Sequence, residues 1–415
     1  MELKRVVVTG LGAITPIGKN ISEFWTSLKN GVSGAATIER FDTQNFKTQF
    51  ACEVKNYNPK DYLDRREAGR IDYYAHFALI SADEAYKDSK LDIEKIDKDR
   101  AGVIWGSGIG GIESLADGVI DYVENNRVPR FSPFFIPKII SDIAAGHISM
   151  KYDFRGPNFA TVSACASSAH AIIQAFDSIR LGKADVFITG GSEAPINPPS
   201  LGGFNALRAI STRNDNPAIA SRPFDRDRDG FVMGEGGAAL ILEEYEHAVK
   251  RGAKIYCELV GTGATADAYH LTAPHPEGRG AAKVMEFALK EAGIEPEKID
   301  YINPHGTATP LGDIAETKAI TTIFGEHAYK LSISSTKSMT GHLLGGAGAL
   351  ESIAAILAMV NNTVPPTINL DNVDERIDSK LDLTPNVCKE REINYALSNT
   401  FGFGGHNASL IFKKI

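Results

Sequence analysis

Cys165 lies in the run TVSACASSAH, where its immediate neighbours are small residues. An alanine-rich apolar pattern with helical spacing follows, which predicts that Cys165 stands at the start of a buried helix. The partial positive charge of a helix start favours the thiolate, which is the nucleophilic form of cysteine. A buried structural cysteine fits the same residues, because free cysteine is among the most buried residue types. The cysteine alone therefore leaves both interpretations open.

Two histidines lie in unusual surroundings. His305 follows a predicted strand in the block NPHGTAT, and His342 ends the block SSTKSMTGH before a second alanine-rich helix. Loops at strand ends are the usual place for catalytic residues in open α/β sheets. A thiol with two imidazoles suggests acyl transfer to sulfur, followed by proton or carboxylate chemistry at the histidines. A cysteine hydrolase, which needs one histidine with an orienting Asp or Asn, stays as a minor alternative.

The elements that must position these residues follow from the apolar pattern. Continuous apolar strands that alternate with helical patterns predict an α/β fold with a mostly parallel sheet covered on both faces. The glycines at 10, 12, 190 and 191 are expected to end their strands. Two alanine-rich helices, at 166–181 and 346–359, predict an internal duplication with these helices packed together in the middle. We therefore expect one half at 1–250 with the cysteine and another at 251–415 with both histidines.

Two glycine-containing motifs resemble ligand sites without their full pattern. The block GSGIGG at 106–111 matches G-x-G-x-x-G after a strand, but Asp121 lies too close and within a helical pattern for a dinucleotide site. The block DRDRDG at 225–230 begins like a calcium loop, but its twelfth position is Gly236 instead of Glu. We expect a rigid turn there with salt bridges from Arg226 and Arg228, and no bound metal.

The composition is that of a globular chain. It has 415 residues, of which 43% are hydrophobic and 23% charged, and a net charge of −8 that argues against binding to nucleic acid or an anionic membrane. Four scattered cysteines suggest neither a disulfide framework nor a zinc site. The longest apolar run in a helical pattern, 353–360, is too short to span a bilayer. We predict a cytoplasmic protein without membrane insertion.

Many blocks in register resemble the β-ketoacyl-acyl-carrier-protein synthases of fatty acid synthesis, most closely the type II condensing enzymes. They include RVVVTGLGAITPIG, SACASSAHA, RPFDRDRDGFVMGEG, NPHGTATPLGD, SSTKSMTGHLLGGAGALES and SNTFGFGGHNASLIFKK. The resemblance implies a thiolase-like fold, two similar α/β halves in a five-layer αβαβα sandwich, and a homodimer. It implies decarboxylative Claisen condensation of acyl-carrier protein with malonyl-carrier protein. No cofactor is expected, since phosphopantetheine arrives on the carrier protein.

The resemblance also implies the catalytic roles. Cys165 would accept the acyl group, and His305 and His342 would promote decarboxylation and hold the resulting enolate. Lys337 would support the electrostatics of the site, through Glu351 and the histidines.

Further residues are implied for the substrate channel. The backbone N–H groups of Cys165 and Phe401 would form the oxyanion hole, and Phe401 would be the gating aromatic of a loop made mobile by the glycines beside Phe403. Thr307 and Thr309 would hydrogen-bond the phosphopantetheine arm. Two further substrate-binding positions complete the set, Phe403 in that loop and Ile109 deep in the acyl channel.

Partner contacts are implied as well. The segment 134–136 resembles the part by which a partner subunit helps to wall the channel. Basic residues match positions that face the acidic carrier protein: Arg66, Arg70, Arg130 and Arg208. The nearest competing activity is a polyketide-type ketosynthase, which has the same triad. A non-catalytic chain-length-factor-like subunit is disfavoured, since such subunits lack the nucleophile.

Overall fold

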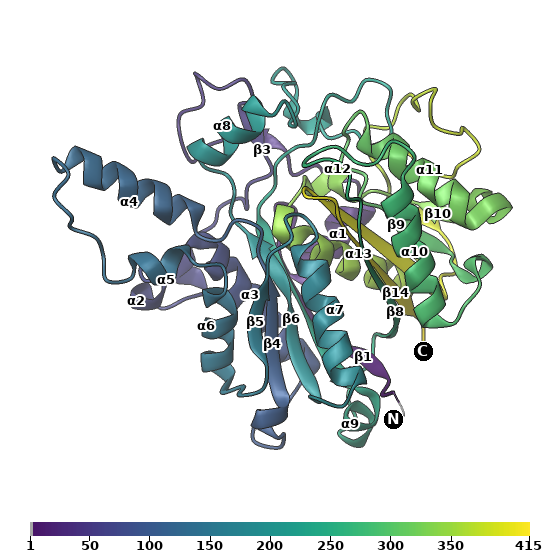
Figure 1. Ribbon diagram of the computed structural model, residues 1–415, viewed down its shortest axis with the longest axis horizontal. Coiled ribbons are helices and arrows are strands. Elements are labelled where there is room, and N and C mark those ends of the chain that lie inside the picture. The colour runs from purple at the N-terminus through teal and green to yellow at the C-terminus, as the bar shows by residue number, and fades with distance from the viewer. Residues whose placement is uncertain (1–2) are drawn as a thin grey trace.

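The computed structural model describes residues 3–415, and a mixed ten-stranded sheet is its framework (Figure 1). The strand order is β10-β9-β13-β14-β8-β1-β7-β6-β4-β5, with five antiparallel and four parallel pairings. The expectation of a mostly parallel sheet is therefore wrong. The strands of the first half are β1 (Val6–Ile14), β4 (Ala101–Gly106), β5 (Asn158–Thr161), β6 (Val186–Glu193) and β7 (Gly236–Glu244). Those of the second half are β8 (Cys257–Ala266), β9 (Tyr301–Asn303), β10 (Ser332–Ile333), β13 (Tyr395–Gly402) and β14 (His406–Lys413).

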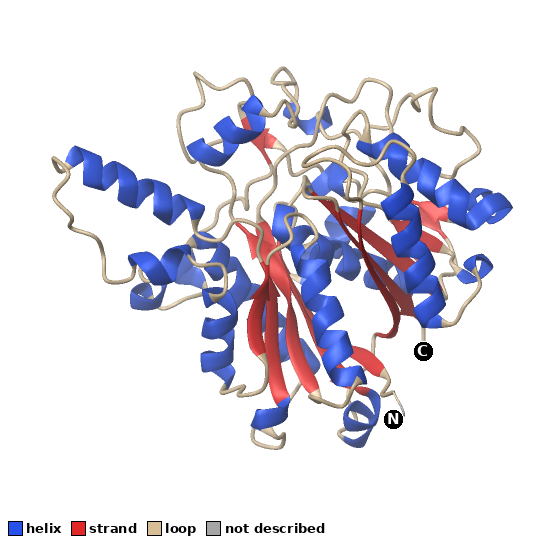
Figure 2. Cartoon of the chain, viewed as in Figure 1, coloured by secondary structure: helices blue, strands red, loops and turns tan. Residues whose placement is uncertain are grey.

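Helices cover both faces of each half of the sheet (Figure 2). On the first half, α3 (Tyr73–Ser89) and α6 (Ile143–Tyr152) lie on one face and α7 (Ser167–Arg180) on the other. On the second half, α13 (Ala347–Asn361) packs against β13 and β9, while α10 (Arg279–Ala292) packs against β8, β14 and α11 (Gly312–Phe324). Because α7 and α13 contact each other, the layers run αβαβα, and the five-layer thiolase-like prediction is confirmed.

Glycines lengthen strands where we expected them to end. β1 continues through Gly10 and Gly12, and β6 continues through Gly190 and Gly191. A Cβ at Gly12 would lie 2.1 Å from the carbonyl oxygen of Ser81 in α3, so only glycine admits the helix this close. These glycines serve helix-to-strand packing and do not act as strand breaks.

The two central helices owe their close approach to small residues. A Cβ at Gly348 in α13 would lie 2.8 Å from that of Ala169 in α7. The segment Leu344–Asn361 has a mean hydropathy of 1.5 over 18 residues, so by length and composition it could cross a membrane. The expectation that no apolar helical run is long enough is thus wrong. The segment is 89% buried inside the protein, which is the pattern of a core helix.

The remaining helices and strands lie around this framework. The described helices are α1 (Ile21–Lys29), α2 (Arg65–Ala68), α4 (Ile112–Glu124), α5 (Phe135–Ile139), α8 (Pro198–Ala206), α9 (Tyr245–Lys250) and α12 (Lys337–Thr340). The short strands are β2 (Ala36–Thr37), β3 (Phe50–Ala51), β11 (Thr363–Val364) and β12 (Lys389–Glu390). α4 projects away from the body as an arm (Figure 1). The predicted boundary at 250 falls at the end of α9, and the division into two domains stays a prediction.

Candidate active site

Cys165 lies in a tight turn between β5 and α7, two residues before the helix begins. Ala164 has a φ of +51°, in the left-handed region that costs a non-glycine residue energy. The Ser167 hydroxyl holds this turn, because it accepts the N–H of Ser163 at 2.9 Å and donates to the carbonyl of Ala164 at 2.7 Å. The prediction of a cysteine next to a buried helix start is confirmed.

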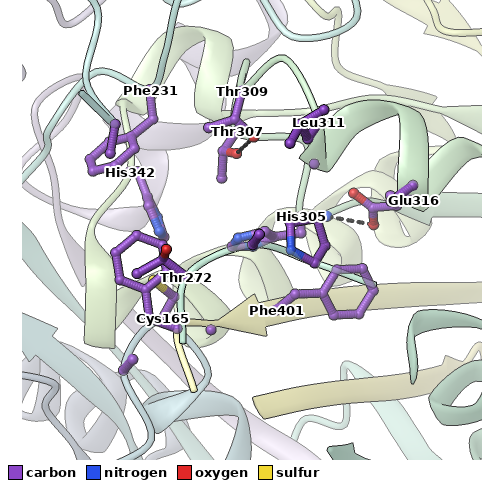
Figure 3. A pocket seen from close by; sticks show the side chains of 18 of the residues that line it. Cys165, Phe231, Thr272, His305, Thr307, Thr309, Leu311, Glu316, His342 and Phe401 are labelled. Carbon is purple, nitrogen blue, oxygen red and sulfur yellow. Dashed lines mark hydrogen bonds between the residues drawn. The ribbon is translucent and has the colours of Figure 1, made fainter. Parts of the chain in front are cut away.

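The thiol faces a cavity of about 390 Å³ whose walls come from both halves of the chain (Figure 3). Most of the predicted site residues line it together: Cys165, His305, His342, Ile109, Thr307, Thr309, Phe401, Phe403 and Arg208. Thr307 and Thr309 lie at hydrogen-bond distance, with 3.1 Å between their hydroxyl oxygens. The fold therefore gathers residues that lie as far apart in sequence as Ile109 and Phe403.

The two histidines face each other across this cavity. Their ring centroids are 5.2 Å apart and the rings are nearly perpendicular (Figure 3). Burial, followed by the charge of Lys337, lowers the pKa of both His305 and His342 well below its ordinary value. Both imidazoles are therefore neutral near pH 7. Three ring nitrogens have no hydrogen-bond partner among the described residues: Nδ1 of His305 and both nitrogens of His342. These atoms are therefore available to a substrate.

The thiol of Cys165 is held in its protonated form. Burial raises its pKa to about 12, against the charge of Lys337 and a hydrogen bond from the backbone N–H of Phe403. The buried carboxylates of Glu193 and Glu351 raise it further. The expectation that the helix start yields a thiolate is therefore wrong, because desolvation is the largest effect on this thiol and favours its neutral form.

The glycine-rich loop after β13 places its two phenylalanines differently. The Phe401 ring packs against His305, with 5.7 Å between ring centroids, whereas the Phe403 ring lies 6.5 Å from that of Phe204. Phe401 thus supports His305 from this loop, whereas Phe403 packs beside Phe204 in the cavity wall. The role of the Phe401 backbone N–H in the oxyanion hole stays a prediction.

Lys337 lies behind the cavity wall and forms a buried ion pair with Glu351. The two residues are 1% and 3% exposed. Burial raises the pKa of Glu351 to about 7, and Lys337 opposes that rise. The predicted link from Lys337 through Glu351 is present, and its effect on the histidines is electrostatic.

The four arginines predicted to face the carrier protein are all exposed. Arg208 is exposed, has a φ of +55° and lines the cavity. Arg66 lies exposed on α2, and the guanidinium of Arg70 lies 5.0 Å from the centre of the Phe134 ring. Arg130 is exposed in the segment after α4. Only Arg208 of the four lines the cavity.

Some site residues were missed from sequence. Glu316 on α11 accepts the backbone N–H groups of His305 and Gly306, both at 2.8 Å, and so fixes the His305 loop (Figure 3). The Phe231 ring packs nearly perpendicular to His342 at 5.3 Å. An acidic residue within a helical pattern carries no local signal of such a role, and Phe231 lay in a quoted block without a reason to single it out.

The turn at 225–230 is held by charge pairs as expected. The buried guanidinium of Arg228 pairs with Asp374 at 2.7 Å and with Asp313 at 3.4 Å, while Arg226 pairs with Asp227 at 3.5 Å on the surface. Within residues 3–415, no group of three or more His, Cys, Asp and Glu side chains is arranged to hold a metal ion.

Known proteins resemble this chain over its whole length. The chain is 50% identical over 414 residues to the 3-oxoacyl-[acyl-carrier-protein] synthase 2 of Synechocystis, with 100% of this chain and 99% of that protein covered. It is 48% identical over 415 residues to the protein of the same name from Coxiella burnetii, with both fully covered.

Solved structures agree with these relatives. A type II polyketide ketosynthase in complex with its acyl-carrier protein has a TM-score of 0.92 at 35% identity, with both chains fully covered. A β-ketoacyl synthase from Burkholderia phymatum has the same TM-score and identity, with 99% and 100% covered. The model of the β-ketoacyl synthase N-terminal domain matches residues 3–248, and that of the C-terminal domain matches 256–371. The chain, with its thiol and two neutral imidazoles around one cavity, belongs to the β-ketoacyl synthase family.

Proposed function

We propose that this chain is a 3-oxoacyl-acyl-carrier-protein synthase of the type 2 class, which elongates fatty acids by decarboxylative Claisen condensation. The observation that carries the proposal is the meeting of Cys165, His305 and His342 at one cavity. Its walls include apolar side chains that suit an acyl chain: Ile109, Phe204, Phe231 and Leu344. The relatives named 3-oxoacyl-[acyl-carrier-protein] synthase 2 at 48–50% identity favour this reaction over a polyketide pathway.

The first half-reaction loads the enzyme. The Cys165 sulfur attacks the thioester carbonyl of acyl-carrier protein, a bond forms between sulfur and the acyl carbon, and the pantetheine thiolate leaves. That leaving group takes up the proton which the Cys165 thiol gives up. The backbone N–H groups of Cys165 and Phe401 would stabilise the oxyanion that forms in this step.

The second half-reaction forms the new carbon–carbon bond. Malonyl-carrier protein loses CO2, and neutral His305 and His342 donate hydrogen bonds to the enolate oxygen that develops. The enolate carbon attacks the acyl-Cys165 carbonyl, and collapse of the tetrahedral adduct releases 3-oxoacyl-carrier protein. The Cys165 thiolate takes up a proton, which restores the starting thiol. Loss of CO2 drives the sequence, so the reaction requires no redox or nucleotide cofactor.

Supporting residues act around this chemistry. Burial keeps the histidines neutral, and the positive charge of Lys337, which is paired with Glu351, adds to this effect. Thr307 and Thr309 offer two hydroxyls in the cavity wall for the amide groups of the phosphopantetheine arm. Glu316 keeps His305 in place through its backbone.

The substrate arrives on an acyl carrier protein. Arg208 stands exposed at the cavity lining and would meet the acidic surface of the carrier near the entrance. Arg66, Arg70 and Arg130 would extend this docking surface beyond the entrance. The solved ketosynthase in complex with its acyl-carrier protein supports a carrier as partner.

A second copy of the chain is the partner we propose for the arm. β5 is an edge strand, and its open row of backbone N–H and C=O groups invites pairing with another strand. Large apolar side chains around this edge and on the arm are 41–61% exposed: Val119, Ile120, Val123, Ile136, Phe159 and Val162. Exposed apolar side chains beside an unpaired strand edge favour a protein interface. A homodimer would bury these side chains. One of them, Val162, lies three residues before Cys165 in the sequence, so the interface would come close to the nucleophile.

We also place the enzyme in the cytoplasm. The four cysteines are free thiols, which suits a reducing compartment.

The test is a comparison of the purified enzyme with its Cys165→Ala variant. The enzyme supplied with acyl- and malonyl-carrier protein should yield 3-oxoacyl-carrier protein and CO2, whereas the variant should form no condensation product and still release CO2 from malonyl-carrier protein. Free fatty acid from acyl-carrier protein would identify a hydrolase instead. No reaction at all would identify a non-catalytic subunit, and condensation by the variant would exclude Cys165 as the nucleophile.

A further inference from the structure

One buried carboxylate beside the cavity takes part in the chemistry above only through the effect of its charge on the pKa of Cys165. Glu193 ends β6 and is 0% exposed. Its Oε1 accepts the Ser107 hydroxyl at 2.9 Å and the Ile109 N–H at 3.2 Å. Its Oε2 accepts the Gly108 N–H at 2.7 Å and the Gly345 N–H at 2.9 Å. One carboxylate thus binds two loops that come from opposite halves of the chain.

The first of these loops is the GSGIGG block that resembles a dinucleotide motif. Its backbone N–H groups converge on an anion, as they do in a phosphate-binding loop. The anion here is Glu193 of the same chain. A Cβ at Gly108 would lie 2.9 Å from Glu193 Oε2, so the glycine admits the carboxylate. The motif is therefore accounted for by an internal ligand.

The second loop follows His342. Leu344 has a φ of +46°, an unfavourable conformation for a branched side chain, and it lines the cavity. The next residue, Gly345, donates its N–H to Glu193, and a Cβ there would lie 2.5 Å from Oε2 and 2.3 Å from the nitrogen of Gly108. The carboxylate therefore also holds a strained segment of the wall.

Both loops place apolar side chains in the wall of the cavity that holds the thiol. Leu344 belongs to the hydrophobic cluster that contains Cys165, Ile109 packs against that cluster, and both line the cavity. We infer that Glu193 is a positioning residue that sets the length of acyl chain the enzyme accepts, because it binds the Ile109 loop to the Leu344 turn. This inference rests on the proposed condensation and names what governs its substrate range.

The hydrogen-bond pattern makes Glu193→Gln a sharp test. Each carboxylate oxygen accepts from two donors, so the NH2 group of glutamine would face two donors whichever way the amide is turned. At least one loop must then be released, although size and shape are nearly unchanged. For the acyl length that the wild-type enzyme prefers, we expect kcat/KM of the variant to fall about tenfold. For chains longer than the wild-type limit, we expect kcat/KM to rise relative to the value for the preferred length.

The experiment measures kcat and KM for a series of saturated acyl-carrier proteins that differ by two carbons. Glu235→Gln is the matched control, since Glu235 is also 0% exposed but its partners Arg40 and Val54 do not line the cavity. That control should keep the wild-type length profile. Ser107→Ala removes one hydrogen bond to Glu193. It should shift the acyl-length profile in the same direction as Glu193→Gln but by a smaller amount, and it replaces that variant in the test if Glu193→Gln does not fold.

The outcomes separate this inference from the proposed function. Wild-type enzyme that forms no 3-oxoacyl product overturns the function itself. Active wild-type enzyme whose length profile is unchanged in Glu193→Gln, or in Ser107→Ala where the first variant is insoluble, overturns the role of Glu193. An equal shift in Glu235→Gln would also overturn it, since the effect would then be general to buried glutamates.

Discussion

Replacing Lys337 with methionine tests the electrostatic design of the site most directly. The side chain is 1% exposed and its ion pair with Glu351 is buried with it. Methionine has a similar length and no charge, so the packing around α12 is largely kept. Removing one partner of a buried ion pair costs about 3–5 kcal/mol, because the other charge is left without compensation.

The size of the expected loss is measurable. At about 2 °C per kcal/mol for a chain larger than 150 residues, Lys337→Met should lower the melting temperature by about 6–10 °C. The double variant Lys337→Met with Glu351→Leu should recover most of this loss of about 3–5 kcal/mol, since no buried charge then remains and replacement of a whole buried ion pair by apolar residues is often neutral for stability. Catalysis should not recover, because the charge of Lys337, which adds to burial in lowering the pKa of both histidines, stays absent.

Thermal and chemical unfolding of both variants, together with malonyl decarboxylation across pH, form the assay. Lys283→Met is the matched control, because Lys283 pairs with Glu286 on α10 with both side chains 51% exposed. Such a surface pair should contribute less than about 1 kcal/mol. A loss no larger than that of the control, or a double variant no more stable than Lys337→Met, would refute the view of Lys337 and Glu351 as one coupled buried unit.

The remaining predictions concern the cavity. His305→Ala should abolish decarboxylation yet still form acyl-Cys165, read by mass spectrometry of the intact protein; absence of the thioester would mean that His305 also activates the thiol. Ile109→Phe should shorten the accepted chains, with about a fourfold loss in kcat/KM for each methylene excluded, and an unchanged profile would place Ile109 outside the acyl path. Burial keeps His305 and His342 neutral, so the rate of decarboxylation should not fall with an apparent pKa near 6.5 as the pH is lowered from 7.5 to 6. A fall in rate with that pKa would mean that the imidazoles are hydrated. Arg208→Glu should raise KM for acyl-carrier protein more at low salt than at high salt, and equal effects would exclude a docking role.

The reactive residues of the site could be predicted from the sequence. Cys165, His305 and His342 stand in blocks whose residue types and strand-end positions are local features, and the cavity brings all three together. The alternation of apolar strands and helices likewise predicted an α/β fold. Its layers and duplicated central helices agree with the observed architecture. Local patterns succeed here because burial on both faces requires continuous apolar strands.

Other features depend on contacts between distant segments. β1 pairs antiparallel with both β7 and β8, and pairings of this kind make the sheet mixed. No local sequence pattern encodes the direction of a partner strand. Gly12 appeared to be a strand end until the close approach of α3 explained it. Similarly, only the folded chain shows that the Phe401 ring packs against His305 while the Phe403 ring packs near Phe204.

The residues of the chain thus determine which reactive groups exist, and tertiary packing decides their chemical state. From the sequence alone, a cysteine at a helix start and two histidines in loops can be predicted to form a condensing triad. That the thiol is protonated with a pKa of about 12, and that both imidazoles are neutral, follows from desolvation in a cavity built by both halves. Desolvation depends on everything that surrounds a group in space, and neighbours in sequence supply only a small part of that surrounding.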